Sequence, residues 1–542
     1  MQTGSIVTAL GRAGGGVAYL RAVVLAVAAL LLVPAAGSGQ PVVARSDWPM
    51  WQFDSPGSRY NANETILTPA NVGALKLKWA FAFPGAIAQS SQPAVVNGTL
   101  YSGGRDGKMY ALDAETGATR WVFDTGTALE HLPGYGLRDG PAVVGGVVYF
   151  GDNAANLWAV DAATGTQRWH TRLDDHPLSI ITSSPLVFEN HVYIGTSSQE
   201  EAGGAADPLY PCCTFRGSVV SVDATTGAVQ WRYSVLAEPT TRTGPPGPTF
   251  SPSGGAIWSS PTIDPATRTL YYTSGNPYTG TPDDAESIGA IDIDTGRRRW
   301  VNSLTPDDTW NVRCIIPPAG GACPIPGRDF DFGAHANIFE IGGRKVVGAG
   351  QKTGIYHLLD AATGAVIWQT QLSVPTSPLP IEGAESLAGI QWGASYDGRW
   401  LYVATYGANP GTLFALDPAT GQVLWRTPNP PDGCLIDVPP VPMDPFCQES
   451  MPNAVSSSPG LVYEGSMDGK MRVFSAETGA ILWEYNTAKV HFHTVNGVPG
   501  LGGGLNGNGA VVANGMLYTN SGYGHPITTG MPGNVLLAFG LP

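Results

Sequence analysis

The sequence is poor in charge and contains no cluster of basic residues. Charged side chains make up 13% of the 542 residues, and 43 acidic against 29 basic residues give a net charge of −14. Nucleic acids and anionic membranes attract proteins through Lys and Arg, so we expect neither as a partner. An acidic surface would instead attract a basic protein.

Long apolar runs are also scarce. The run "AVVLAVAALLLVPAAGSG" follows Arg12 and begins just after Arg21, and it ends in small residues. This pattern is typical of an export signal and is too short for a membrane span. We therefore expect residues 1–45 to be a signal peptide and leader, with an uncleaved anchor as the alternative. Residues 46–542 would form the mature protein, without a membrane span, in the periplasm or secreted.

The chain has only six cysteines, and the motif Cys-x-x-Cys-His that attaches haem is missing. In an oxidising compartment cysteines pair, and the spacing favours three local disulfides, Cys212–Cys213, Cys314–Cys323 and Cys434–Cys447. The adjacent pair is unusual because neighbouring Cα atoms lie about 3.8 Å apart, below the usual disulfide span.

Glycine and proline, by contrast, are abundant, with 71 and 45 residues, which indicates a turn-rich β protein with few long helices. One phrase recurs, as in "YALDAETGATRW" and "FALDPATGQVLW": a strand, a turn carrying Thr-Gly, and a second strand closed by Trp. Gly in that turn reaches positive φ without steric cost. The phrase ends at Trp121, Trp169, Trp231, Trp300, Trp368, Trp425 and Trp483.

A segment that reads as a two-strand hairpin, such as "PAVVGGVVYFGD", precedes each phrase, so the repeating unit is four short antiparallel strands. Such a repeat predicts a β-propeller. Trp79 lacks the strands that should precede it, and the C-terminal "PGNVLLAFGLP" has strands without a Trp. We therefore expect an all-β, eight-bladed β-propeller of four-stranded antiparallel blades, closed by N- and C-terminal strands. The Trp rows would pack between blades.

Four long insertions interrupt the later repeats. Loops of this length inside a compact domain are usually functional, and we expect them around one end of the ring. They span residues 197–213, 302–332, 427–450 and 485–510.

The repeat "AxDAxTGxxxW", which gives eight units behind the expected export signal when Trp79 is counted, resembles the quinoprotein alcohol dehydrogenases. These eight-bladed propellers hold pyrroloquinoline quinone (PQQ) and Ca²⁺ on their axis. Within the family, "YPCCTFRGSVV", "GRDFDFG", "GQKTG" and "HTVNGVPGLGG" look most similar to the polyvinyl-alcohol dehydrogenases.

This resemblance implies a metal site. The segment "ITSSPLVFENHVYIGTSSQE" matches one whose Glu binds Ca²⁺, which implies Glu200, and "IWSSPTIDPATRTLYYTSGNP" places Asn276 in the same site. Glu201 is the alternative ligand, since a one-residue shift exchanges the two glutamates. Asp331 completes the expected set, and such oxygen ligands suit a hard divalent cation.

Asp331 is also the expected catalytic base, with Asp329 as the alternative. In methanol-oxidising relatives the base directly follows a Trp, but here that place holds Asn311, whose amide cannot accept a proton. Lys352 in "QKTG" matches the Arg or Lys next to the quinone carbonyl, where a cation stabilises the negative oxygen that develops. Relatives that use a trivalent ion often carry a carboxylate two residues after the base, and Gly333 at that place favours calcium.

Further cofactor contacts are implied around the quinone, with Trp258 as its floor. In methanol-oxidising relatives a vicinal disulfide packs over the quinone ring, opposite that floor. Here the pair follows the expected calcium Glu, so it is either a cofactor contact or a staple of its loop. The expected cofactor-binding residues are Gln89, Arg138, Thr182, Ser197, Ser198, Cys212, Cys213, Trp258, Lys352, Gln391 and Trp392.

The implied reaction is the oxidation of a secondary alcohol, with poly(vinyl alcohol) as the substrate that the resemblance suggests. Asp331 would take the hydroxyl proton while hydride passes to PQQ, polarised by Ca²⁺ and Lys352. An external cytochrome c would then accept the electrons, because the chain has no haem motif. The alternatives are a non-catalytic exported propeller scaffold and a quinoprotein acting on sugars or aldehydes.

Overall fold

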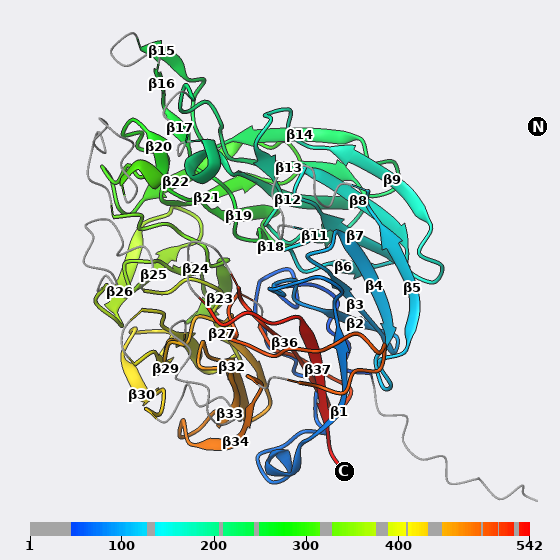
Figure 1. Cartoon of the computed structure of the whole chain (residues 1–542). Helices are drawn as coiled ribbons and strands as arrows, with labels where there is room; N and C mark the ends of the chain where they lie inside the picture. The colour runs from blue at the N-terminus through cyan, green and yellow to red at the C-terminus, as the bar shows by residue number, and fades with distance from the viewer. Residues whose placement is uncertain are drawn as a thin grey trace, which may run out of the picture. The chain divides into compact units, whose positions relative to one another are not determined.

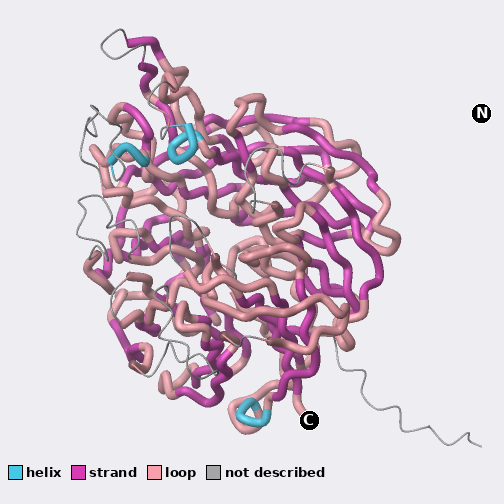
Figure 2. The backbone as a smooth tube through the Cα atoms, in the orientation of Figure 1, coloured by secondary structure: helices cyan, strands magenta, loops and turns pink. Residues whose placement is uncertain are grey.

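The computed structural model describes residues 45–126, 136–204, 207, 210–242, 249–314, 328–375, 389–407, 410–431, 447–488, 491–507, 509–524 and 530–542. The predicted leader therefore lies, except for Arg45, outside the described residues. Figure 2 shows strands throughout this part of the chain, together with three short helical segments, η1 (Val72–Ala74), η2 (Glu200–Gly204) and η3 (Val312–Cys314). No described helix is long and apolar enough to cross a membrane.

Eight four-stranded antiparallel sheets form the blades of a ring (Figure 1), which confirms the predicted propeller. In each blade the first strand lies nearest the centre and the fourth at the rim. The first four blades are β2 (Ala94–Val96), β3 (Thr99–Gly103), β4 (Lys108–Asp113), β5 (Thr119–Asp124); β6 (Ala142–Val144), β7 (Val147–Gly151), β8 (Asn156–Asp161), β9 (Gln167–Arg172); β11 (Leu186–Phe188), β12 (His191–Ser198), β13 (Ser218–Asp223), β14 (Val229–Ser234); and β18 (Thr262–Asp264), β19 (Thr269–Thr273), β21 (Ser287–Asp292), β22 (Arg298–Ser303). The other four are β23 (Asn337–Ile341), β24 (Arg344–Gly350), β25 (Ile355–Asp360), β26 (Val366–Gln371); β27 (Ser395–Tyr396), β28 (Leu401–Ala404), β29 (Thr412–Leu416), β30 (Val423–Pro428); β31 (Ser456–Ser458), β32 (Leu461–Gly465), β33 (Lys470–Ser475), β34 (Ile481–Asn486); and β35 (Val511–Ala513), β36 (Met516–Ser521), β37 (Val535–Gly540), β1 (Lys76–Ala82).

The last blade joins the two ends of the described chain. Strand β1 pairs antiparallel with β37, from Lys76 opposite Gly540 to Ala82 opposite Val535. This pairing closes the ring and leaves no sheet edge between its first and last blades. The predicted closure is confirmed.

The repeated tryptophans connect neighbouring blades. Each lies in the fourth strand of its blade, and its indole N–H donates a hydrogen bond of 2.9–3.1 Å to a backbone carbonyl of the next blade. The predicted packing role is therefore confirmed. The eight donor–acceptor pairs are Trp79–Ala114, Trp121–Ala162, Trp169–Ala224, Trp231–Ile293, Trp300–Ala361, Trp368–Pro418, Trp425–Ala476 and Trp483–Leu75.

The glycine of the Thr-Gly turn packs against the tryptophan of the preceding blade. Gly421, for example, has φ of +72°, and a Cβ there would lie 2.6 Å from Cε3 of Trp368. Only glycine combines this backbone conformation with this close approach. The repeat "TG…W" therefore encodes both the turn and the contact between blades.

Residues 48–61 run past the innermost strands of several blades. Ser457 of β31 and Ile338 of β23 donate backbone hydrogen bonds to Arg59 and Pro56, respectively. The fully buried Arg59 guanidinium donates to the Trp51 carbonyl at 2.6 Å and lies 4.9 Å above the Trp51 ring. Burial lowers the pKa of Arg59 to about 9, against the opposing charge of Glu464. This segment positions the Trp51 ring against the Arg59 guanidinium.

Five strands lie outside the four-stranded arrangement of the blades. Strand β10 (Ser179–Ile180) adds to β12, and β17 (Ser253–Gly254) pairs with β20 (Pro277–Thr279). Strands β15 (Thr240–Arg242) and β16 (Thr249–Ser251) form a hairpin that projects away from the ring in Figure 1.

Candidate active site

A narrow cavity, about 430 Å³ with its opening to solvent included, lies among the segments that precede the innermost strands of the blades. Most lining residues come within four positions before the innermost strand of a blade, so seven blades contribute to it. The lining residues are Trp51, Ser90, Arg138, Thr182, Ser184, Trp258, Ser259, Ser260, Gly333, Trp392, Gly507 and Tyr523.

Three tryptophans make one wall of this cavity. The Trp258 and Trp392 rings meet edge to face with centroids 5.2 Å apart, and Trp51 meets Trp392 at 6.3 Å. The Trp392 indole N–H donates to Asn506 Oδ1 at 2.8 Å, which fixes that ring. A Cβ at Gly333 would lie 2.0 Å from Cη2 of Trp258, so only glycine leaves room for this indole. Because the planes of Trp258 and Trp392 are 88° apart, a planar ligand can stack on only one of these two rings at a time.

Next to Trp258 lies a buried cluster of charges. The Lys352 ammonium donates to Asp329 Oδ1 at 3.0 Å and to Asp331 Oδ2 at 3.1 Å. Its nitrogen also lies 5.3 Å from the Trp258 ring centroid. The other oxygen of Asp331, Oδ1, accepts the backbone N–H of Asn276. A carboxylate, a cation and an aromatic surface thus meet at one place.

The cluster is electrostatically unbalanced. Burial disfavours the charged form of Lys352, but Asp329 and Asp331 outweigh it and raise the pKa of the ammonium. Burial likewise raises the pKa of Asp329 well above its ordinary value, although Lys352 acts in the opposite direction. Lys352 therefore stays cationic, and the two carboxylates compete for its charge.

Glu201 adds a third carboxylate to this environment. Burial first, and then Asp331 and Asp329, raise its pKa well above the ordinary value. Both hydrogens of the Asn276 amide are donated, to the carbonyls of Pro277 at 3.0 Å and Trp310 at 2.7 Å, so its Oδ1 is left to accept or coordinate. An excess of carboxylate with an amide oxygen fits a hard cation.

Among the described residues, no three His, Cys, Asp or Glu side chains form a metal-binding group by themselves. A cation here would need the Asn276 oxygen and oxygens of a bound molecule as further ligands. The oxygens present are compatible with such a shared site, in which protein and cofactor each supply part of the coordination.

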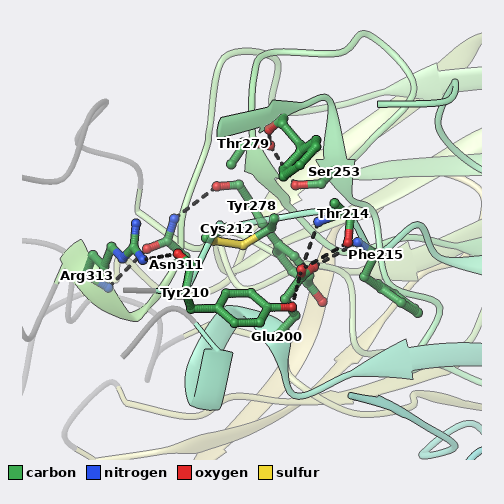
Figure 3. The surroundings of a disulfide bond; sticks show 12 residues. Glu200, Tyr210, Cys212, Thr214, Phe215, Ser253, Tyr278, Thr279, Asn311 and Arg313 are labelled. Carbon is green, nitrogen blue, oxygen red and sulfur yellow. Dashed lines mark hydrogen bonds between the residues drawn. A yellow bond between two sulfur atoms is a disulfide. The ribbon is translucent and has the colours of Figure 1, made fainter. Parts of the chain in front are cut away.

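Glu200, the expected metal ligand, is engaged within its own loop (Figure 3). Its Oε1 accepts the Tyr210 hydroxyl at 2.9 Å and the Thr214 N–H at 2.8 Å, and its Oε2 accepts the Phe215 N–H at 2.8 Å. His176 Nε2 lies 3.3 Å from Oε1. Burial works against ionisation, but His176 and the two backbone N–H groups outweigh it and lower the pKa of Glu200. The charges of the Lys352 cluster act instead on Glu201, the alternative ligand.

The predicted Cys212–Cys213 disulfide is confirmed. The peptide bond between the two residues is cis, and their exposed fractions are 3% and 0%. The pair does not line the cavity described above. Cys447 is also disulfide-bonded. The other predicted pairings involve Cys323, Cys434 and the side chain of Cys314, which lie outside the described residues.

Four further expected cofactor residues lie at or near the cavity. Arg138, Thr182 and Trp392 line it. The Thr182 hydroxyl and the Gln391 carbonyl oxygen are buried with no hydrogen-bond partner in the part of the chain that the structure describes. Buried polar atoms normally find partners, so these two atoms fit contacts to a bound polar molecule.

The remaining expected contacts have other partners. Gln89 donates its side-chain N–H to the Gly103 carbonyl. Ser197 and Ser198 end strand β12, and the Ser198 hydroxyl lies 3.4 Å from that of Tyr278. None of the three is among the residues that line the cavity.

Sequence reasoning missed Trp51, Ser90 and Tyr523, which also line the cavity. The stretch "DWPMWQFD" around Trp51 is rich in aromatics outside the repeat, and this was the available signal. Tyr406 was missed as well. Its hydroxyl is buried, has no hydrogen-bond partner among the described residues, and interacts electrostatically with Tyr523 and Lys352.

Comparison with solved structures supports the fold. The quinohemoprotein alcohol dehydrogenase of Pseudomonas putida HK5 matches with a TM-score of 0.68 at 22% identity, covering 92% of this chain and 80% of that structure. A family profile named PQQ_2, described as outer membrane protein assembly factor BamB, matches residues 43–305, 284–385 and 351–515. The fold is thus that of the quinoprotein propellers.

Two sequence relatives identify the family to which the chain belongs. The polyvinylalcohol dehydrogenase of a Pseudomonas species is 34% identical over 511 residues, covering 91% of this chain and 76% of the relative. That of Sphingopyxis sp. strain 113P3 is 34% identical over 522 residues, covering 92% and 76%. The chain belongs to the PQQ-dependent alcohol dehydrogenases, in the family that includes the polyvinylalcohol dehydrogenases.

Proposed function

We propose that this protein oxidises secondary alcohols of a polymer such as poly(vinyl alcohol) to ketones, using PQQ and Ca²⁺, and passes the electrons to an external cytochrome c. The observation that carries the proposal is the contact of Lys352 with Asp331 beside the aromatic wall at Trp258. Bound PQQ would supply the acceptor for the hydride that leaves the alcohol carbon.

Asp331 is the proposed base. Its carboxylate is held by the Asn276 N–H and by Lys352, so its oxygens keep one orientation relative to the Trp258 wall. From there it can accept the hydroxyl proton of an alcohol. Lys352 supplies a fixed positive charge where negative charge develops on oxygen during hydride transfer. Asp329, the alternative base, shares the same ammonium.

The proposed metal ligands are Glu201, Asn276 and Asp331, which selects the alternative glutamate over Glu200. The reason is that Glu200 already accepts hydrogen bonds from Tyr210, Thr214 and Phe215, whereas the charges of Asp331 and Asp329 act on Glu201. Carboxylate and amide oxygens suit Ca²⁺.

Trp258 is proposed as the ring on which the quinone stacks, with Trp392 at its edge and Arg138, Thr182 and Gln391 as polar contacts. All but Gln391 line the same cavity, and the Thr182 and Gln391 oxygens have no protein partner in the described chain. Cationic and hydroxyl groups of this kind suit the carboxylates and carbonyls of PQQ.

The polymer substrate is proposed from the names of the two relatives at 34% identity, and small secondary alcohols or sugars are the competing substrates. The external acceptor is proposed because the chain has no haem-attachment motif and has a net charge of −14, which suits a basic cytochrome. Export is proposed from the apolar leader, and N-terminal sequencing of secreted protein tests it.

Dye reduction by purified protein tests the proposal. With added PQQ and Ca²⁺, poly(vinyl alcohol) and 2-alcohols should reduce the dye, whereas omission of either addition should abolish the reaction. A non-catalytic scaffold would show no reduction with any alcohol. Faster turnover of glucose or aldehydes would show that sugars or aldehydes are the substrates.

A further inference from the structure

The segments that carry Glu200, Asn276 and Trp258 meet at the vicinal disulfide. Cys212 and Cys213 form one buried apolar cluster with Phe215, Ala256, Tyr278 and Val312, and Trp258 packs against it. The disulfide is buried, with exposed fractions of 3% for Cys212 and 0% for Cys213, and its cluster packs against Trp258 of the proposed site. Neither cysteine is among the residues that line the cavity.

The first of these segments is joined to the disulfide through Glu200. The backbone N–H groups of Thr214 and Phe215, the two residues after Cys213, both donate to the Glu200 carboxylate at 2.8 Å. Tyr210, two residues before Cys212, donates its hydroxyl to the same carboxylate at 2.9 Å. Glu200 is therefore held from both sides of the disulfide, as Figure 3 shows.

Holding the Glu200 side chain in place also restricts the direction of the next side chain, Glu201. Glu200 and Glu201 begin the π-helical turn η2, and π turns occur frequently at functional sites. With the Glu200 side chain turned toward residues 210–215, the next side chain along the turn is directed elsewhere. Burial, and then the charges of Asp331 and Asp329, raise the pKa of Glu201.

The second segment carries Asn276. The N–H of Gly275 donates to the carbonyl of Ala256 at 2.8 Å, and Ala256 belongs to the disulfide cluster. Tyr278, on the other side of Asn276, belongs to it as well. Asn276 is thus bracketed by two contacts that lead back to the disulfide.

We propose that the Cys212–Cys213 disulfide is a positioning element for the metal site, which directs Glu201 through Glu200 and holds Asn276 through Ala256 and Tyr278. This inference rests on the proposed function, since it assumes that Glu201 and Asn276 bind the metal. It assigns the disulfide no redox step and no contact with substrate. Glu200 would then orient a metal ligand without touching the ion. Mutation of groups with such a role typically lowers metal affinity about 10–100-fold.

Calcium affinity is the measurement that tests this role. Apo protein is titrated with Ca²⁺ at a fixed excess of PQQ, and the quenching of tryptophan fluorescence reports assembly of the site. The double variant C212S/C213S and the variant Glu200→Gln should each bind Ca²⁺ about 10–100-fold more weakly than wild type. Activity at saturating Ca²⁺ should fall far less than affinity, since no group that touches substrate is changed.

The matched control is C434S/C447S, which removes the predicted disulfide of a different loop and should leave calcium affinity within about twofold of wild type. Tyr210→Phe removes one of the hydrogen bonds to Glu200 and should give a smaller loss than Glu200→Gln. If the double cysteine variant fails to fold, the Glu200 and Tyr210 variants still decide the question.

Wild-type calcium affinity in Glu200→Gln, or in a folded C212S/C213S protein, would overturn the inference. An equal loss in C434S/C447S would do the same, because the effect would then be general destabilisation. If instead wild-type protein assembles no site with PQQ and Ca²⁺, the proposed function fails before this inference is reached.

Discussion

The ammonium nitrogen of Lys352 lies 3.1 Å from Oδ2 of Asp331, in a buried cluster beside the Trp258 ring. The two side chains come from different places in one blade, Asp331 from the entry to β23 and Lys352 from the turn between β24 and β25. Antiparallel strands bring the start of the first strand and the end of the second to the same end of a blade. The repeat itself therefore creates the pair.

Replacing Asp331 by Asn should abolish proton abstraction. The amide keeps the shape but cannot accept a proton, so turnover should fall about 10²–10⁴-fold, the usual contribution of a general base. Dye-linked assays with a 2-alcohol measure this, and circular dichroism confirms that the fold is kept. Asp329→Asn is the matched control. If Asp329→Asn lost more activity than Asp331→Asn, the base would be Asp329.

Replacing Lys352 by Met should lower turnover about 10²–10³-fold, because a preorganised group that stabilises developing charge contributes on that scale. Lys352→Arg keeps the charge and should retain more activity than the Met variant. The ratio of kcat values between Arg and Met variants is the measurement. Equal activities would show that the charge of residue 352 does not act in the reaction.

The contact between blades predicts a difference between two glycines. Both Gly421 and Gly398 have positive φ, at +72° and +88°, but a Cβ at Gly421 would approach Trp368, whereas one at Gly398 meets open space. Gly421→Ala should therefore destabilise the protein by about 1–3 kcal/mol more than Gly398→Ala, the usual cost of overpacking. Urea unfolding of both variants measures it. Equal losses would leave only the backbone penalty and contradict the packing role.

The burial of His357 predicts that the free energy of unfolding depends on pH. Its Nε2 lies 2.9 Å from Gln351 Oε1 and its Nδ1 lies 2.8 Å from Gln369 Nε2, so the neutral ring donates to Gln351 and accepts from Gln369. Burial lowers the pKa of His357 to about 3, from an ordinary 6.5. Between these values the unfolded chain binds a proton that the folded protein does not, so stability falls as pH falls from 6.5 toward 3.

Each such histidine contributes about 1.4 kcal/mol per pH unit to that slope. His357→Gln should flatten the dependence of unfolding free energy on pH by up to this amount. His170→Gln, at an exposed position, is the control. An unchanged slope in the His357 variant would mean that the ring is protonated in the folded protein at these pH values.

The eight-bladed fold could be predicted because each repeat contains the residues that contact the neighbouring blades. The Trp at the end of a blade and the Gly of the next turn touch each other, so their spacing alone gives the number of blades and the closure through Trp79. The gathering of Arg138, Thr182, Trp258 and Trp392 follows from the same rule, since each stands just before an innermost strand.

The choice between Glu200 and Glu201 could not be predicted in this way. The two residues lie in a π-helical turn, whose side chains do not follow the alternation of a strand or the period of an α-helix, so neighbouring positions cannot be assigned to faces from sequence. The place of Trp51 in the cavity could not be predicted either, because it depends on the path of residues 48–61 past several blades. Hydrogen bonds to Glu200 from Tyr210, Thr214 and Phe215 were needed to separate the two glutamates.

A crystal structure of this protein reconstituted with PQQ and Ca²⁺ would locate both groups. We expect electron density for the planar quinone against the Trp258 indole, and an ion bound to oxygens of Glu201, Asn276 and Asp331. Density for the quinone at another place in the ring, or an ion coordinated by Glu200 in place of Glu201, would contradict the proposed site.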